Sequence, residues 1–176
     1  IRHCMDLGKQ AIMLVPEISL TPQMVERFVS RFGDSVAVMH SGLSVGERYD
    51  QWNRIKNGEV SVVVGARSAV FVPFDNIGII ILDEQHENSY KSDISPRYHA
   101  ADVAIHRGER SGAPVLFASA TPDAATYYHA LNGEYTLFEM NKRYNENDMP
   151  KARIVDMRSE LFDLHNNSPI SIRLQE

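Results

Sequence analysis

The sequence is poor in cysteine, in excess positive charge and in long apolar runs. Cys4 is its only cysteine, so no internal disulfide can form, and no Cys-x-x-Cys pair offers a zinc site. Asp and Glu (23) outnumber Lys and Arg (18), for a formal net charge of -5, so any contact with nucleic acid has to be local. No apolar run is long enough to span a membrane and no signal peptide is visible. These features predict a cytoplasmic protein with no membrane partner.

A phosphate-binding loop is missing as well. No Gly-x-x-x-x-Gly-Lys-[Ser/Thr] segment, the Walker A loop that cradles nucleotide phosphates, occurs anywhere in the chain. The first residues, 1–8, have the pattern of a helix tail closed by Gly8, which predicts that the chain is a piece of a longer protein. The seven histidines show no His-Glu-x-x-His pattern, which argues against a transition-metal site.

What the sequence does contain is a regular alternation of apolar strands and helices. We expect strands at 10–15, 35–39, 60–64, 78–82 and 114–118, with later ones at 135–138 and 152–155. We expect helices that begin at 21–22, run over 45–57 and 96–110, and begin again at 121–123. Strands that are apolar throughout are covered on both faces, so the pattern predicts an α/β fold with a mostly parallel sheet and helices on both faces.

Polar or small residues follow five consecutive predicted strands. They are Pro16-Glu17, His40-Ser41-Gly42, Gly65-Ala66-Arg67-Ser68, Asp83-Glu84-Gln85-His86 and Ser119-Ala120-Thr121. In open parallel sheets, ligands bind beyond the carboxyl ends of the strands. The sequence therefore predicts one functional edge of the sheet.

The segment Asp83–His86 is the central feature of that edge. A carboxylate at the end of a buried strand, here Asp83, can hold Mg²⁺ beside nucleotide phosphates, and Glu84 can orient the attacking water. The alternative is an ordinary acidic loop after a strand. The apolar Ile-Ile-Ile-Leu run before it and the other segments at suitable spacing favour the nucleotide site.

Six segments, taken in order and spacing, resemble the primosomal replication-restart DNA helicases of superfamily 2. They are Val15–Gln23, His40–Leu43, Gly65–Phe74, Asp83–His86, Arg97–Ala100 and Ser119–Pro122. The resemblance runs from about Gly8 to Arg143. It implies a RecA-like P-loop NTPase lobe without its Walker A segment: residues 1–140 would be a partial first helicase lobe, and 141–176 a linker and the start of the connection to a second lobe.

The resemblance implies ATP hydrolysis coupled to 3′-to-5′ translocation on DNA in replication restart and primosome assembly. Asp83 would bind Mg²⁺ and Glu84 would be catalytic. Four residues would couple nucleotide and metal to the neighbouring motifs: Gln85, His86, Ser119 and Thr121. Thr121 is also expected as a helix N-cap. The family usually has Glu where this chain has Gln85, a change that removes a charge and keeps hydrogen bonding, so we do not expect it to abolish hydrolysis.

The resemblance also assigns DNA contacts to strand ends and to a loop that mixes aromatic and cationic residues. They are Pro16, Glu17, Gly65, Arg67, Ser68, Tyr90, Lys91, Arg97 and Tyr98. Aromatic rings stack on unpaired bases and cations hold phosphates. The alternatives are a Tyr98 packed in the core and an Arg67 engaged in an intramolecular salt bridge.

The implied partners of the longer protein are ATP, Mg²⁺, forked or single-stranded DNA, and primosome and single-strand-binding proteins, with zinc expected only in the second lobe. The 176-residue chain, without its phosphate loop, is expected to be inactive by itself. Three alternatives stay open at this point: another superfamily 2 helicase such as a recombination-type enzyme, a non-catalytic DNA-binding module, and an unrelated magnesium-dependent α/β hydrolase.

Overall fold

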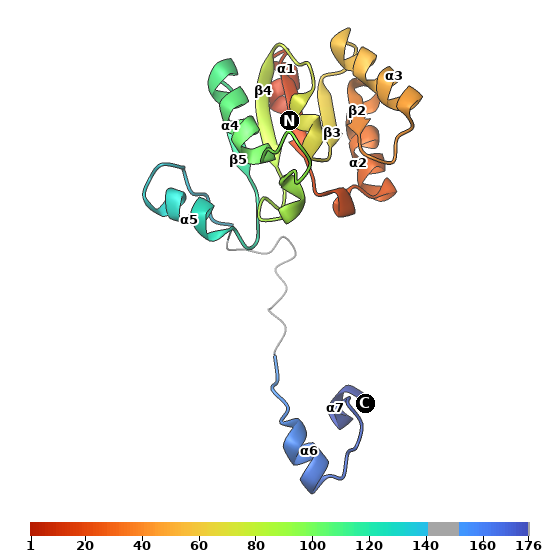
Figure 1. Ribbon diagram of the computed structural model, residues 1–176, viewed down its shortest axis with the longest axis vertical. Coiled ribbons are helices and arrows are strands. Elements are labelled where there is room, and N and C mark those ends of the chain that lie inside the picture. Colours follow the sequence, from red (N-terminus) through yellow and green to blue (C-terminus); the bar gives the residue numbers. More distant parts are fainter. Residues whose placement is uncertain (141–151, 176) are drawn as a thin grey trace. The chain divides into compact units, whose positions relative to one another are not determined.

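The computed structural model describes residues 1–140 and 152–175, which belong to two compact units, Ile1–Thr136 and Leu137–Glu176 (Figure 1). The larger unit is built on a five-stranded sheet of order β2-β3-β1-β4-β5. The strands are β1 Gln10–Leu14, β2 Val36–Met39, β3 Val62–Gly65, β4 Ile77–Leu82 and β5 Val115–Phe117. All four pairings are parallel. The predicted parallel α/β architecture is confirmed.

Helices cover both faces of this sheet, as the apolar strands require. The helices of the larger unit are α1 Arg2–Asp6, α2 Pro22–Phe32, α3 Val45–Lys56, α4 Ala100–Ser111 and α5 Ala124–Leu131. Short 3-10 turns are η1 Glu17–Ser19, η2 Gly33–Ser35, η3 Arg67–Phe71 and η4 Asn88–Tyr90. Connections of this kind between parallel strands place the helices above and below the sheet.

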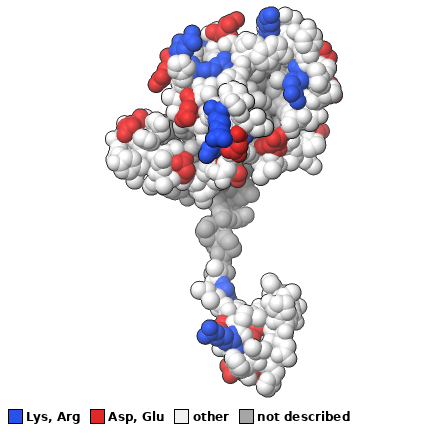
Figure 2. Space-filling model, viewed as in Figure 1, with Lys and Arg blue, Asp and Glu red and all other residues white. Residues whose placement is uncertain are grey.

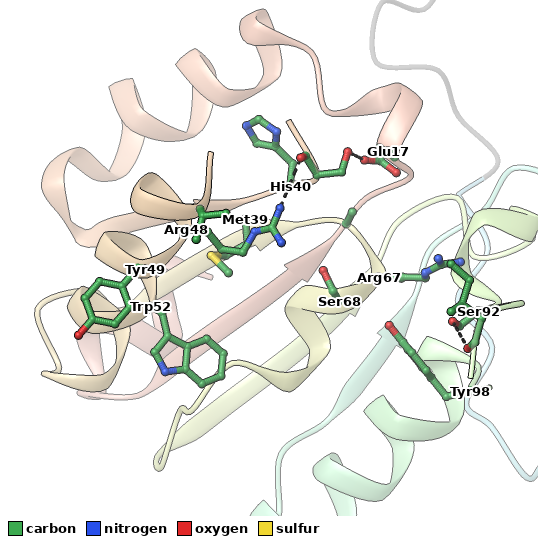
Figure 3. Close-up of a pocket in the computed structure, with 14 residues that line it drawn as sticks. Glu17, Met39, His40, Arg48, Tyr49, Trp52, Arg67, Ser68, Ser92 and Tyr98 are labelled. Atoms are coloured by element: carbon green, nitrogen blue, oxygen red, sulfur yellow. Dashed lines mark hydrogen bonds between the residues drawn. The ribbon is translucent and has the colours of Figure 1, made fainter. Parts of the chain in front are cut away.

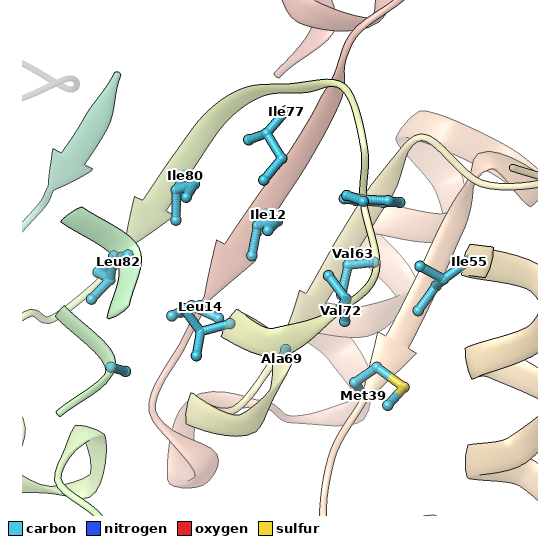
Figure 4. Packing of buried hydrophobic residues seen from close by; sticks show 14 of the residues in the cluster. Ile12, Leu14, Met39, Ile55, Val63, Ala69, Val72, Ile77, Ile80 and Leu82 are labelled. Atoms are coloured by element: carbon cyan, nitrogen blue, oxygen red, sulfur yellow. The ribbon is translucent and has the colours of Figure 1, made fainter. Parts of the chain in front are cut away.

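The core is divided by the sheet into two layers. On one face, Ile12, Ile80 and Leu82 pack with Ile55 of α3, with η3 and with α4 (Figure 4). On the other face the sheet residues are Val15, Val36, Val62 and Val64, which pack against Met5 of α1 and Met24, Phe28 and Phe32 of α2. Met24, Phe28 and Phe32 recur at helical spacing, so they form the partly buried stripe of α2.

Local signals fix where the helices begin and end. The Thr21 hydroxyl accepts a hydrogen bond from the Met24 amide at the start of α2. Ser44 and Glu47 cap α3 reciprocally, each side chain bonding the other's backbone amide. Gly112, in the left-handed conformation at φ 64°, ends α4.

Four predicted features are wrong at the level of local structure. Residues 135–138 and 152–155 form no strand, since neither segment pairs with another strand among the described residues. Helix α4 begins at Ala100 and not at Pro96, because Lys91 and His99 form an antiparallel bridge that keeps the preceding residues extended. Asp123, not Thr121, is the N-cap of α5, since its carboxylate accepts the free amides of the first turn.

The smaller unit carries helices α6 Met157–Asp163 and α7 Ile172–Gln175. Its buried polar residue is Glu160, whose Oε2 accepts hydrogen bonds from Asn166 Nδ2 at 2.7 Å and from the Ile172 amide at 2.9 Å. The bond from the Ile172 amide joins α7 to α6, and the bond from Asn166 holds the segment between them. The predicted linker, 141–151, lies outside the described residues. Within the described parts of the chain, no helix has the length and apolarity needed to cross a membrane.

Gly65 is a position where a side chain has no room. A Cβ there would lie 2.4 Å from the Met39 carbonyl oxygen and 2.7 Å from Ala69 Cβ. We expect Gly65→Ala to destabilise the chain by about 1–3 kcal/mol, because backbone would have to shift. Gly46→Ala in α3, where a Cβ meets nothing within 4 Å, is the matched control and is expected to be neutral or slightly stabilising. Urea denaturation of both variants checks this; equal stabilities would contradict it.

Candidate nucleotide and DNA site

The acidic segment follows β4, at the carboxyl edge of the sheet. The Asp83 amide donates to the Leu14 carbonyl at 2.9 Å and so extends the pairing of β4 with β1. The Gln85 amide donates to the Ala118 carbonyl at 3.0 Å, which ties the same segment to the end of β5. Asp83 and Glu84 are thus held between two strand ends, half-buried and open to a ligand.

The backbone at Glu84 is left-handed, with φ 46°. A residue with a β-carbon pays roughly 1–2 kcal/mol for this conformation, which persists only where the surroundings hold it. Here the Glu84 amide bonds Asp83 Oδ1 at 3.1 Å, and the Glu84 carbonyl accepts the Glu87 amide at 2.9 Å. The resulting turn leaves the Glu84 side chain 45% exposed, available to a water molecule at the edge.

Tyr90 packs in the core beside the acidic segment and bonds its backbone. Its ring is fully buried and its hydroxyl donates to the Asp83 carbonyl at 2.6 Å. Burial and the nearby Asp83 and Glu84 carboxylates raise the pKa of Tyr90 far above its ordinary value, so the hydroxyl stays a donor. A buried ring presents no face to a base. The structure therefore contradicts base stacking by Tyr90 in this conformation and gives it a supporting place under Asp83.

His86 connects the acidic segment to the residues after β5. Its Nδ1 lies 2.7 Å from Ser119 Oγ, and its Nε2 lies 3.4 Å from Thr121 Oγ1. Ser119 Oγ also accepts the Thr121 amide at 3.0 Å. Glu84 Oε2 is 3.7 Å from His86 Nδ1. Three of the four residues predicted to couple nucleotide and metal to neighbouring motifs, His86, Ser119 and Thr121, thus lie in one connected polar network.

Gln85 makes a second connection, to helix α5. Its Nε2 donates to Asp123 Oδ2 at 2.6 Å and to Thr126 Oγ1 at 3.0 Å. Burial acts to raise the pKa of Asp123, but hydrogen bonds from Thr126, Gln85 and Ala125 outweigh it and lower the pKa to about 2. The hydrogen bonds to the Asp123 carboxylate thus stabilise the fold at pH values above 3.8, the ordinary pKa of Asp. This stabilisation is lost as the pH falls towards 2. A Glu at position 85 would set carboxylate against carboxylate.

The donors at this edge suit Mg²⁺. Asp83 and Glu84 offer hard carboxylate oxygens, and Mg²⁺ is commonly held by one or two carboxylates, with water and substrate phosphates completing its shell. Among the residues described, no group of three or more His, Cys, Asp or Glu side chains is placed to hold a metal ion. A magnesium ion held by Asp83 and Glu84 would therefore need further ligands from water or phosphate.

A cavity of about 600 Å³ opens at the carboxyl ends of β2 and β3 (Figure 3). Its lining includes Glu17, Arg48, Tyr49, Trp52, Arg67, Ser68 and Tyr98. The Ser41 hydroxyl bonds the Glu17 carboxylate. Arg67 Nη1 donates to the carbonyls of Ser89 and Lys91 instead of forming a salt bridge. The structure thus gathers residues of three predicted DNA-contact segments around one hollow.

The remaining predicted DNA contacts divide into exposed and buried positions. Ser68, Lys91 and Arg97 are exposed, while Pro16 and Gly65 are buried in the sheet edge. Tyr98 is half-buried: it packs against the core and its ring meets Phe71 edge-on at 4.9 Å, yet it also lines the cavity. Figure 2 shows basic and acidic side chains interspersed on the face it presents, which fits a local and not a general affinity for nucleic acid.

Sequence reasoning missed five residues of these sites: Arg48, Tyr49, Trp52, Asp123 and Thr126. The first three lie on α3, for which the sequence predicted a helix and no site residue. The pair on α5 has a signal in the sequence, an Asp three residues before a Thr at a helix start. That pattern predicts a cap and not its bond to Gln85.

Comparison with known proteins identifies the family to which the chain belongs. The chain belongs to the DEAD/DEAH box helicase family, whose profile matches residues 1–129. The family and the parallel sheet confirm the predicted RecA-like α/β fold.

The resemblance to replication-restart helicases is confirmed by individual relatives. The chain is similar to replication restart protein PriA of Bacillus subtilis (strain 168), with 56% identity over 176 residues, which is 100% of this chain and 22% of the relative. PriA of Synechocystis sp. (strain ATCC 27184 / PCC 6803 / Kazusa) is 44% identical over 159 residues, 88% of this chain and 19% of the relative. The chain thus spans about a fifth of the length of these relatives. Among solved structures, RecG bound to a three-way DNA junction shares 25% identity at a TM-score of 0.48, over 72% of this chain and 16% of that one.

The contact between Gln85 and Asp123 can be tested by reversing it. We expect Gln85→Glu alone to destabilise the larger unit by about 1–3 kcal/mol at neutral pH. The variant removes the amide that donates to Asp123 and places a second carboxylate beside it. Adding Asp123→Asn should recover most of this loss, since Asn caps helices as well as Asp and supplies the missing donor. Urea denaturation of the two single variants and the double variant measures the coupling; simple additivity would contradict it.

Proposed function

We propose that this chain is part of an ATP-dependent 3′-to-5′ DNA helicase that acts in replication restart and primosome assembly. The observation that carries the proposal is the acidic segment at the parallel sheet edge, joined through His86 to Ser119 and Thr121. The identity to PriA proteins supports replication restart as the setting. Because the chain spans about a fifth of those relatives, activity belongs to the longer protein.

In the proposed reaction, Asp83 would hold Mg²⁺, which neutralises charge on the phosphates when bound. Glu84 orients the attacking water and accepts its proton, a role for which its exposed side chain and fixed backbone are suited. His86 reports the state of Glu84 to Ser119 and Thr121 through the network already described. Gln85, which keeps α5 attached, takes no part in the chemistry.

DNA is proposed to bind at the cavity edge and the loop that follows the acidic segment. Arg67 fixes that loop through the Ser89 and Lys91 carbonyls, and Tyr90, which lies between them, bonds the Asp83 carbonyl. A shift of the loop on DNA binding would therefore reach the Asp83 backbone directly. Exposed Lys91 and Arg97 are suited to phosphates, and Glu17, Ser68 and Tyr98 line the hollow beside them.

Several elements of the sequence prediction stay predictions for the longer protein. They are the Walker A loop, the second lobe with its zinc, the cytoplasmic setting, and the primosome and single-strand-binding partners.

Replacing Glu84 tests the hydrolysis step. In the longer protein, we expect Glu84→Gln to leave ATP binding nearly unchanged and to lower DNA-stimulated turnover by at least roughly a hundredfold, because the water loses its proton acceptor. Steady-state ATPase and nucleotide binding, measured side by side, check this. The 176-residue chain, which lacks the phosphate loop, is the background control. Turnover that is unchanged in Glu84→Gln would remove Glu84 from catalysis.

Removing the exposed cations of the loop tests the DNA contact. Lys91→Ala with Arg97→Ala should weaken binding of single-stranded DNA uniformly across sequences and reduce the salt dependence of affinity by about one unit of slope per lost phosphate contact. The matched control is Lys56→Ala with Arg110→Ala, which removes the same charge from the last turns of α3 and α4. An equal effect of both pairs would show a general charge effect and contradict the loop contact.

A further inference from the structure

Helix α3 presents aromatic side chains that its own packing does not use. It buries only Ile55, while Tyr49 is 65% exposed and Trp52 is 38% exposed. Both line the cavity at the ends of β2 and β3. In Figure 3, Ser68 lies between Trp52 on one side and Tyr98 on the other. Aromatic rings from α3 and from the loop before α4 therefore border one open hollow.

The chemistry of this hollow favours a planar ring with a phosphate beside it. Two cations line it, Arg48 and Arg67, and Ser68 adds an exposed hydroxyl. Among the described residues, the hydrogen bonds of Arg48 are long, 3.4 Å to the carbonyls of Ser41 and Leu43. A contact with phosphates alone would gain nothing from exposed rings, whereas unpaired bases stack on such rings and leave their phosphates to nearby cations.

The size of the hollow agrees with such an occupant. Its volume of about 600 Å³ lies within the range of roughly 300–1,000 Å³ that is common for small-molecule sites. The chain's net charge of -5 also requires that any affinity for DNA come from a confined place with its own attractive contacts.

We propose that this cavity accepts an unpaired base of a DNA strand, which stacks on Trp52 while Arg48 faces a neighbouring phosphate. Tyr49 and Tyr98 border the base at the rim. The proposal rests on the proposed DNA-binding function and deepens it: the lobe would hold the strand by a base as well as by its backbone. Because every base has an aromatic face, the pocket would be tolerant of sequence.

Trp52 is the only tryptophan of the chain, so its fluorescence reports on the pocket alone. We expect oligothymidylate to quench this fluorescence when it is added to the 176-residue chain. An abasic strand of the same length, which has the same phosphates, should bind more weakly and quench little. Equal affinity and equal quenching by the two strands would overturn the proposal.

Substitutions separate stacking from a structural effect. Trp52→Ala should weaken binding of labelled oligothymidylate, measured by anisotropy, by about 5- to 100-fold, and should leave the abasic strand's affinity unchanged. Trp52→Phe, which keeps a ring, should recover most of the affinity. Tyr128→Ala, on the exposed face of α5, is the control and should change neither.

Two further outcomes would overturn the base pocket: an equal loss of affinity for both strands in Trp52→Ala, or no binding of either strand to the wild-type chain. Neither outcome affects the Glu84→Gln measurement of turnover in the longer protein. A failed base pocket and a failed hydrolysis proposal are therefore distinguishable.

Discussion

Parallel pairing of every strand is the constraint on which the rest of this structure depends. It forces the carboxyl ends of all five strands to one edge, so that segments from residue 16 to residue 121 converge although they are distant in the chain. The bond from the Asp83 amide to Leu14 and the bond from Gln85 to Ala118 continue the ladders past the strands. The acidic segment is consequently positioned by the sheet itself and not by a flexible loop.

The sheet and the convergence of the polar segments at one of its edges were predictable because both follow from short-range patterns. Apolar runs mark strands that are buried on both faces, and the polar residues after them mark the ligand edge. The segments at 135–138 and 152–155 resemble strands equally well in composition, yet they pair with nothing among the described residues. Strand formation needs a neighbouring strand, and a local pattern carries no information about one.

The candidate site was predictable only in part, both in its members and in the surroundings of each residue. Tyr90 has the composition of a stacking residue, and only the three-dimensional structure shows the ring buried beneath Asp83. Trp52 has the spacing of a core residue, and only the structure shows it facing a hollow. In both cases the role depends on whether the aromatic ring is buried or exposed to solvent. Tertiary packing determines this exposure, and residue type alone does not.

Gln85 illustrates how a single side chain sets the hydrogen bonding between the acidic segment and α5. Its amide must point Nε2 towards Asp123, since the carboxylate there accepts and the opposite orientation would place two oxygens 2.6 Å apart. This leaves the buried Oε1 without a hydrogen-bond partner among the described residues. An unsatisfied buried acceptor costs on the order of 1–3 kcal/mol, while the bonds of Nε2 attach α5 to the acidic segment. The bond from Gln85 Nε2 to the ionised Asp123 carboxylate is charge-assisted, and we infer that it outweighs the cost of leaving Gln85 Oε1 without a partner. Because Gln85 is an amide, the contact does not require either side chain to be a protonated acid.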